Sequence, residues 1–297
     1  MRLPDLVFKE LFEQRELSLA DRSLYLYLRV RPGLNQSRLA VDLGLSRGAV
    51  TGGCQSLCAL EWVRFTGSGS RRRPVAVIPP RCQERLAEVL EKMYSMAPNR
   101  GEFLMKCLLD VWVCSDYYMD NARPSFLTSP LSDQPLEYDR YYPEEAVAFE
   151  FNGSQHSSLT EKFNDEKEHK AVAVRDLIKE SLSTRAGVTL VVITPEHLRP
   201  GAFAGKLPKG LPRNFADQEG PYFRALAGLC IAYAAKTELM MAQEQQAQSG
   251  QQPQTTQAAQ VKQAQAAQEK QPPSKPAQTT QVARPGKPEP GIKVRNK

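Results

Sequence analysis

Residues 136–156 constrain the fold of this chain most, because they read as two strands that each carry one carboxylate. A turn at Pro143-Glu144-Glu145 joins them. Asp139 lies near the end of the first strand, and Glu150 lies inside the apolar second strand. A carboxylate buried without compensation is costly, and a divalent cation held by both residues would compensate it. The pattern therefore predicts a hairpin with a metal site.

The alternation of strand side chains defines one polar face. Ala148, Glu150 and Asn152 share that face, since side chains two residues apart point the same way. The chain then turns at Gly153, which is expected to place His156 at the same end of the hairpin. Two carboxylates and an imidazole at one hairpin end suit Mg²⁺ or Mn²⁺ beside a phosphodiester.

Further residues surround this hairpin in a defined order. Glu102 lies on a helix before it, the strand pair ends in Gly153-Ser-Gln-His156, and Arg175-Asp-Leu-Ile-Lys179 lies on a helix that leads to the strand 187–194. This order resembles the PD-(D/E)xK nuclease superfamily, most closely the branch of very-short-patch repair endonucleases. The resemblance implies a restriction-endonuclease-like α/β domain that cuts DNA with Mg²⁺ or Mn²⁺.

The same resemblance implies roles for individual residues. Asp139 and Glu150 would hold the metal, and His156 would orient the attacking water or act as general base. Lys179 would neutralise charge on the phosphate, and Glu102 would complete the acidic site. One residue departs from the pattern, because Asn152 stands where the superfamily has Lys, and Asn cannot act as a base. Lys179 or Lys170 would have to supply the positive charge.

Structural interpretations compete with these roles. A Glu in the first turn of a helix is favourable without any metal. Asp176 and Lys179, three residues apart on a helix, can form an ordinary surface pair. A degenerate site would bind DNA without cutting it.

Residues 19–78 predict a winged helix-turn-helix. A helix capped near Ser18, a second over 35–43 and a third starting after Ser46 are followed by a Gly/Ser-rich hairpin. The pattern resembles winged-helix domains of bacterial regulators and replication proteins. In such a domain the third helix enters the major groove and the wing contacts phosphates or the minor groove. The predicted DNA-binding residues are Arg47, Thr51, Gln55, Arg71, Arg72 and Arg73. The alternative is a protein–protein module with a solvated wing.

The expected organisation is a winged-helix domain over 1–78, a connecting helix over 79–97, a nuclease-like domain over 98–243 and a disordered tail over 244–297. The last helix of the folded part is expected from Tyr222 to about Gln243. The tail lacks aromatic residues and is rich in Gln, Ala, Pro and Lys, so it cannot bury a core. The fold class is therefore α/β (α+β).

Charge and cysteines narrow the functional classes. The net charge is +6, but residues 242–297 hold eight Lys or Arg and three acidic residues, so the folded part is nearly neutral. Local patches, not a global field, must attract nucleic acid. The six cysteines form no Cys-x-x-Cys pair, which disfavours zinc and favours reduced thiols. No apolar run is expected to reach the length of a membrane span, so a cytoplasmic location is expected.

The sequence thus predicts a DNA-binding, metal-dependent endonuclease suited to restriction, mismatch repair or mobile-element maintenance. DNA is the expected partner, with a second copy of the chain or other mobile-element or replication proteins as further candidates. The alternatives are a non-catalytic regulator or replication accessory protein with a degenerate nuclease fold, and an RNA-processing nuclease.

Overall fold

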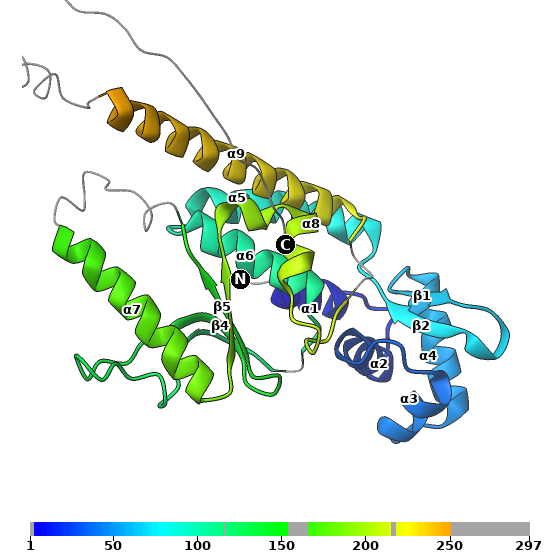
Figure 1. Ribbon diagram of the computed structural model, residues 1–297. Helices are drawn as coiled ribbons and strands as arrows, with labels where there is room; N and C mark the ends of the chain where they lie inside the picture. Colours follow the sequence, from blue (N-terminus) through cyan, green and yellow to red (C-terminus); the bar gives the residue numbers. More distant parts are fainter. Residues whose placement is uncertain (1–2, 116, 154–165, 215–217, 251–297) are drawn as a thin grey trace, which may run out of the picture. The chain divides into compact units, whose positions relative to one another are not determined.

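The computed structural model describes residues 3–115, 117–153, 166–214 and 218–250 (Figure 1). Residues Met1–Ala247 form one unit, and the remainder of the chain forms a second. Helices alternate with two sheets in the first unit, which confirms the expected mixed α and β class. The following description concerns that unit.

The N-terminal part contains four helices and a short antiparallel hairpin. Its elements are α1 (Leu3–Phe12), α2 (Leu19–Val30), α3 (Gln36–Asp42), α4 (Arg47–Ala59), β1 (Val63–Thr66), η1 (Gly69–Arg71) and β2 (Arg73–Ala76). The caps expected at Ser18 and Ser46 are present, and Asn35, expected as the first residue of its helix, is a cap as well. Each accepts a backbone N–H of the helix that follows. Helix α1 was not expected, although Leu3, Val7 and Leu11 recur every four residues and are buried.

Helices α2 and α4 approach each other closely at Gly53. A Cβ placed there would stand 2.7 Å from Asp21 Oδ1 and 3.1 Å from Leu24 Cδ2. The glycine, which lowers intrinsic helix stability, therefore provides the space that this helix pair needs. Buried Tyr25 and Trp62 then meet edge to face, with ring centroids 5.0 Å apart.

The second sheet has four strands in the order β3-β4-β5-β6. They are β3 (Met119–Ala122), β4 (Tyr138–Tyr142), β5 (Val147–Phe151) and β6 (Thr189–Ile193). The first three are antiparallel, and β6 pairs with β5 in parallel. The acidic hairpin, its turn and the strand after it lie where the sequence predicts them.

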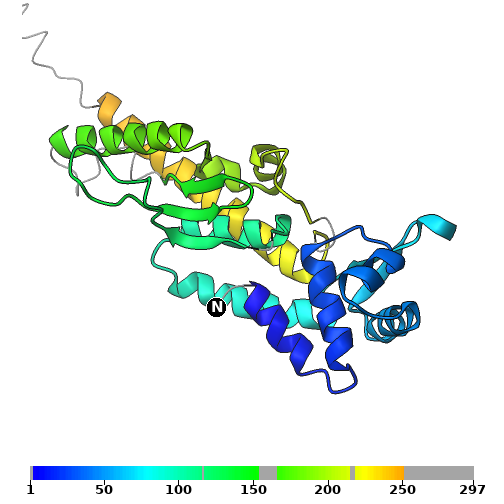
Figure 2. The ribbon, with the colours of Figure 1, turned by 90° about the horizontal axis from the view of Figure 1, so that it is seen from below.

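Helices cover both faces of this sheet. Helix α7 (Glu166–Arg185) packs on β6, and α6 (Arg100–Trp112) packs on β5 from the other side (Figure 2). Helix α5 (Pro80–Met96) is the expected connecting helix, and α1 packs against both α5 and α6. The end of the hairpin therefore lies between two helical layers.

A buried ion-pair cluster fixes the hairpin to α6. Arg140, 1% exposed, donates to Asp110 Oδ1 at 2.6 Å and to both carboxylate oxygens of Asp120 at 2.7 and 3.3 Å. The ring of Tyr118 covers its guanidinium at 4.3 Å. Because Asp139 immediately precedes Arg140, this anchoring also positions the first carboxylate of the candidate site.

The C-terminal elements close the other side of α6. They are η3 (Pro195–Leu198), α8 (Pro200–Lys206) and α9 (Pro221–Gly250). The expected apolar stripe of α9 is confirmed: Leu226 and Cys230 are buried, whereas Ile231, off the stripe, is 50% exposed. The helix continues to Gly250, beyond its expected end near Gln243. The Ala, Gln and Glu residues there are good helix formers.

Among the residues that the structure describes, one helix, α9, is long and apolar enough over Pro221–Gln243 to cross a membrane, by length and composition. The expectation that no run reaches this length was therefore wrong. Within the unit, one face of this stretch packs through ring contacts of Phe223 with Trp112 and of Tyr233 with Phe151.

A single hydrophobic cluster contains residues from both expected domains, from Leu3 and Leu57 to Phe149 and Cys230. A smaller cluster lies under α7, around Tyr138 and Ala148. None of the six cysteines forms a disulfide in the described part of the chain; five are buried, and Cys58 is exposed.

Candidate active site

Asp139 stands at the point where the β4–β5 ladder ends. The last paired residues are Arg140 and Phe149, so the next step places Asp139 opposite Glu150. The carboxylate of Asp139 accepts a hydrogen bond from the backbone N–H of Phe151 at 2.6 Å, where the backbone pairing of the two strands has ended. Opposed residues on neighbouring strands have their Cβ atoms about 5 Å apart, so the two carboxylates lie beside each other.

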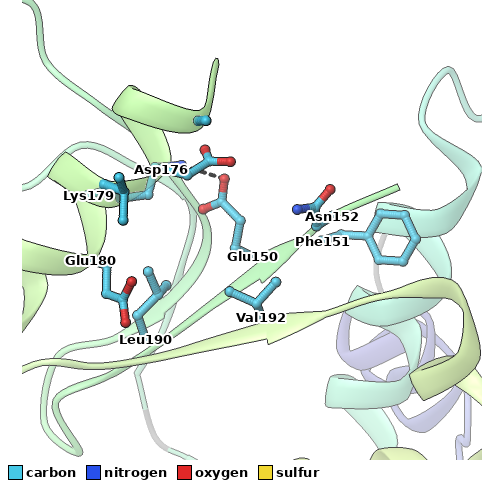
Figure 3. A pocket seen from close by; sticks show the side chains of 10 residues that line it. Glu150, Phe151, Asn152, Asp176, Lys179, Glu180, Leu190 and Val192 are labelled. Atoms are coloured by element: carbon cyan, nitrogen blue, oxygen red, sulfur yellow. Dashed lines mark hydrogen bonds and ion pairs between the residues drawn. The ribbon is translucent and has the colours of Figure 1, made fainter. Parts of the chain in front are cut away.

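Glu150 forms an ion pair with Lys179 of α7 through its Oε1 atom (Figure 3). The side chain of Lys179 is 9% exposed, and that of Glu150 is 25% exposed. The other oxygen of Glu150, Oε2, is buried and has no hydrogen-bond partner. A buried acceptor without a partner is costly, so this atom is available to a ligand.

Helix α6 brings a second acid–base pair to the site. Glu102, in its first turn, accepts from Lys106 Nζ at 2.6 Å, and Lys106 also donates to Asn121 at 2.6 Å. Gly101 allows α6 to lie close to β5, because a Cβ at this position would stand 2.1 Å from the ring of Phe151. Glu102 thus has a local partner on its own helix and also contributes charge to the hairpin end.

Burial raises the pKa values of both hairpin carboxylates. The pKa of Asp139 rises to about 6 through burial, opposed by the N–H of Phe151, and the negative charge of Glu102 raises it further. The pKa of Glu150 rises to about 7 through burial, opposed by Lys179, and the charge of Asp139 raises it further. The protein alone therefore does not fully compensate the negative charge of either carboxylate.

A cleft of about 410 Å³ opens on this group. Asp139 and Glu150 line it together with Glu102, Arg100 and Tyr233. Hard oxygen donors, one of them buried without a partner, fit a hard divalent cation such as Mg²⁺ or Mn²⁺. Among the described residues, no three His, Cys, Asp or Glu side chains gather into a metal site. The protein thus offers two carboxylates, and the other ligands would be backbone, water or substrate oxygens.

The structure brings together four of the five predicted catalytic residues: Asp139, Glu150, Glu102 and Lys179. His156 lies outside the described residues. Asn152 lines a second cavity beside Glu150, and Lys179, not exposed Lys170, makes the ion pair there. Sequence reasoning missed Lys106 and Arg100. The spacing of four residues between Glu102 and Lys106 is the signal that predicts their pairing.

The predicted DNA-binding residues lie on α4 and the β1–β2 hairpin. A groove of about 640 Å³ runs between them, lined by Thr51, Gln55, Arg72 and Arg73. Arg72 stacks on the ring of Phe65, 4.0 Å from its centroid. Arg47 and Arg71 are exposed outside that lining.

Comparison with known proteins gives little information about this site. No protein-family profile and no solved structure matches the chain. A stretch of 73 residues is 33% identical to a protein of Invertebrate iridescent virus 3 described as "Uncharacterized protein 033L". The match covers 24% of this chain and 38% of the viral protein, a similarity that names no activity.

Proposed function

We propose that this chain is a DNA-binding, metal-dependent endonuclease in which a winged helix holds DNA and a PD-(D/E)xK-like site hydrolyses a phosphodiester bond. The observation that carries the proposal is the pairing of Asp139 and Glu150 at one hairpin end, with Lys179 on one oxygen of Glu150 and the other oxygen buried without a partner. The order of elements that the resemblance implies also supports it.

Asp139 and Glu150 would hold Mg²⁺ or Mn²⁺. When bound, such a cation lowers the pKa of a coordinated water and offsets charge that develops on the phosphate. Magnesium commonly binds to one or two carboxylates and completes its shell with water and substrate oxygens, which matches a site with two carboxylates.

The remaining residues have separate roles in this proposal. Lys179 holds Glu150 in place and keeps a positive charge beside the reacting phosphate. Arg100, on the wall of the cleft, is placed to bind a neighbouring phosphate. His156 would orient the attacking water or accept its proton, as the resemblance implies. Asn152 can donate or accept a hydrogen bond but cannot accept that proton.

The N-terminal helices and hairpin would position the duplex. In a winged helix, Arg47, Thr51 and Gln55 face base edges, and Arg71, Arg72 and Arg73 contact phosphates. The groove between α4 and the hairpin, lined by polar and basic side chains, is the observation that supports DNA over a protein partner. A cytoplasmic location is part of the same proposal.

The rival function is a DNA-binding regulator with a degenerate nuclease fold. Asn152 and the lack of a third described metal ligand favour it. An RNA-processing nuclease is the second rival. RNA would be cut at the same pair of carboxylates, so only a preference for RNA over DNA as substrate distinguishes this rival from the main proposal.

The test is cleavage by the purified full chain. Supercoiled plasmid, linear duplex, single-stranded DNA and RNA are incubated with Mg²⁺ or Mn²⁺, beside an EDTA control. Cleavage of DNA should need the metal and should fall roughly 100-fold or more in Asp139→Asn and Glu150→Gln. Glu137→Gln removes a carboxylate that pairs with Arg123 outside the cleft, and it should cut normally. DNA binding without cleavage under all metal conditions would favour the regulator, and preferential RNA cleavage the RNA nuclease.

A further inference from the structure

A second cavity, of about 490 Å³, also borders Glu150. Glu150 and Phe151 line both cavities, so the two meet at the candidate metal site. The second cavity lies between helix α7 and strand β6, which is the edge strand of the sheet (Figure 3). Its lining includes Glu150 and Lys179, but the mechanism proposed above does not use the cavity as a binding space.

The lining of this cavity combines apolar walls with polar groups. Leu190 and Val192 rise from β6 on the face that carries Glu150, because the parallel register pairs Glu150 with Val192. From α7, Ala173, Asp176, Leu177 and Glu180 recur at helical spacing and face the same space. Asn152, Asp176 and Glu180 therefore supply hydrogen-bonding groups beside apolar side chains.

The apolar walls are unusually open to solvent. Leu177 is 65% exposed and Val192 is 41% exposed, although both face the cavity from regular elements. One residue further along α7, Ile178 packs against the core, so the helix is docked to the sheet and still leaves this space. An exposed apolar surface beside a candidate catalytic group is typical of a ligand site.

We propose that this cavity receives an unstacked nucleobase of the strand that is cut, an inference that rests on the proposed nuclease function. A nucleobase has two apolar faces and a polar edge. Leu177, Leu190 and Val192 would contact the faces, and the carboxylates of Asp176 and Glu180 would accept hydrogen bonds from base N–H groups. Proteins that extrude a base read it in this way, between apolar or aromatic side chains.

The position of Glu150 determines which base is bound. Since Glu150 lines both cavities, a phosphate held at the acidic cleft and a base in the second cavity must belong to the same or neighbouring nucleotides. Base extrusion is least costly where the base is mismatched, bulged or single-stranded. The preferred substrate would therefore be DNA with an unpaired nucleotide at the cut position, in preference to a perfect duplex.

Binding measurements with the full chain in Ca²⁺ or EDTA test this without relying on cleavage. The probes are a duplex with one bulged nucleotide, the same duplex with an abasic residue at the bulge, and the fully paired duplex. Leu177→Ala should weaken binding of the bulged duplex roughly 5- to 10-fold. The abasic residue should cause a similar loss with the wild-type chain, and the two changes together should cause no further loss.

Val174→Ala is the matched control, because Val174 is 43% exposed on the same helix but does not line the cavity. It should bind all three probes like the wild type. Equal affinity of the wild-type chain for the abasic and bulged duplexes, or equal weakening by Leu177→Ala on both, would overturn the inference alone. So would a change of oligomeric state in Leu177→Ala, which would make this surface an interface between copies. Failure of every probe to bind would overturn the proposed function as well.

Discussion

Asp139 and Glu150 hold their protons to higher pH than ordinary carboxyl groups do in the metal-free protein, because burial disfavours their charged forms and raises their pKa values to about 6 and about 7. The folded state therefore binds these protons more tightly than the unfolded chain does. The stability that results is fully present below the ordinary pKa of each acid and is lost as the pH rises through the raised value. A bound cation would remove this loss by compensating both charges.

Asp139→Asn should consequently stabilise the metal-free protein at alkaline pH relative to acidic pH. The pKa of Asp139 lies at about 6 instead of 3.8, so the wild type loses stability between pH 4.5 and pH 8 and the variant does not. The free energy of unfolding of the variant minus that of the wild type should therefore be about 1–2 kcal/mol higher at pH 8 than at pH 4.5. Urea denaturation in EDTA at both pH values measures this. Glu137→Gln, which replaces a carboxylate outside the cleft, is the control variant. An equal effect of Asp139→Asn at both pH values would contradict the raised pKa.

The ion pair between Glu150 and Lys179 predicts a coupled pair of substitutions. Lys179→Met alone leaves Glu150 without its cation and should lower the free energy of unfolding by about 1–3 kcal/mol. Adding Glu150→Gln removes the unpaired charge and should recover most of that loss. Denaturant midpoints of the two single variants and the double variant form the cycle. Additive losses would show that the two side chains do not stabilise each other in solution.

At the scale of elements, the close approach of α6 to β5 predicts a steric effect at Gly101. An alanine Cβ there would meet Phe151 at 2.1 Å and the Tyr233 hydroxyl at 2.8 Å, so Gly101→Ala should destabilise the protein by about 1–3 kcal/mol. Gly228→Ala is the control, since nothing lies within 4 Å of that position on α9. It should stabilise the protein by about 0.5–1 kcal/mol, because alanine favours helix. Thermal melts that rank the two variants in the opposite order would contradict this packing.

The hairpin between β1 and β2 predicts a charge effect on DNA binding. Replacing Arg71, Arg72 and Arg73 by Ala should weaken binding similarly for all sequences and lower the salt slope by up to roughly 0.9 for each phosphate that the variant no longer neutralises. Arg47→Ala should instead reduce the preference among sequences. Replacing the exposed residues Lys92, Arg175 and Lys236 is the control for the change in net charge. Gel shifts over a salt series in which both triple variants behave alike would contradict a specific role of the hairpin.

Elements with local signals could be predicted from the sequence, and those that depend on distant partners could not. Three helices begin after Ser18, Asn35 and Ser46. An N-cap is a local signal, because its side chain bonds only to the first turn of the helix that follows. Strand β3 gives no such signal: Asp120 and Asn121 favour turns, and the strand exists because β4 pairs with it. Likewise, Asp139 and Glu150 were found from their strand pattern. The ion pair of Glu150 with Lys179 depends on how α7 packs, which the sequence left open between Lys179 and Lys170.

At the scale of the whole molecule, one hydrophobic cluster joins parts that the sequence suggested were separate domains. Helix α1 packs on α5 and α6, so the N-terminal helices share buried surface with the elements that carry the candidate active site. A shared core of this kind usually unfolds as one cooperative unit. A substitution in the core of one predicted domain should then lower the stability of both.

The two tryptophans allow a direct test, because Trp62 is buried in the N-terminal part and Trp112 lies at the end of α6. Both indole N–H groups lack a partner, so replacement by Phe removes no hydrogen bond. In Trp62→Phe, fluorescence reports α6, and in Trp112→Phe it reports the N-terminal helices. Leu28→Ala, at a buried position of α2, should be added to each and should shift both urea midpoints equally, with a loss of about 2–5 kcal/mol in the free energy of unfolding. If Leu28→Ala shifted only the midpoint reported by Trp62, the N-terminal part would be an independent folding unit that is only docked on α6.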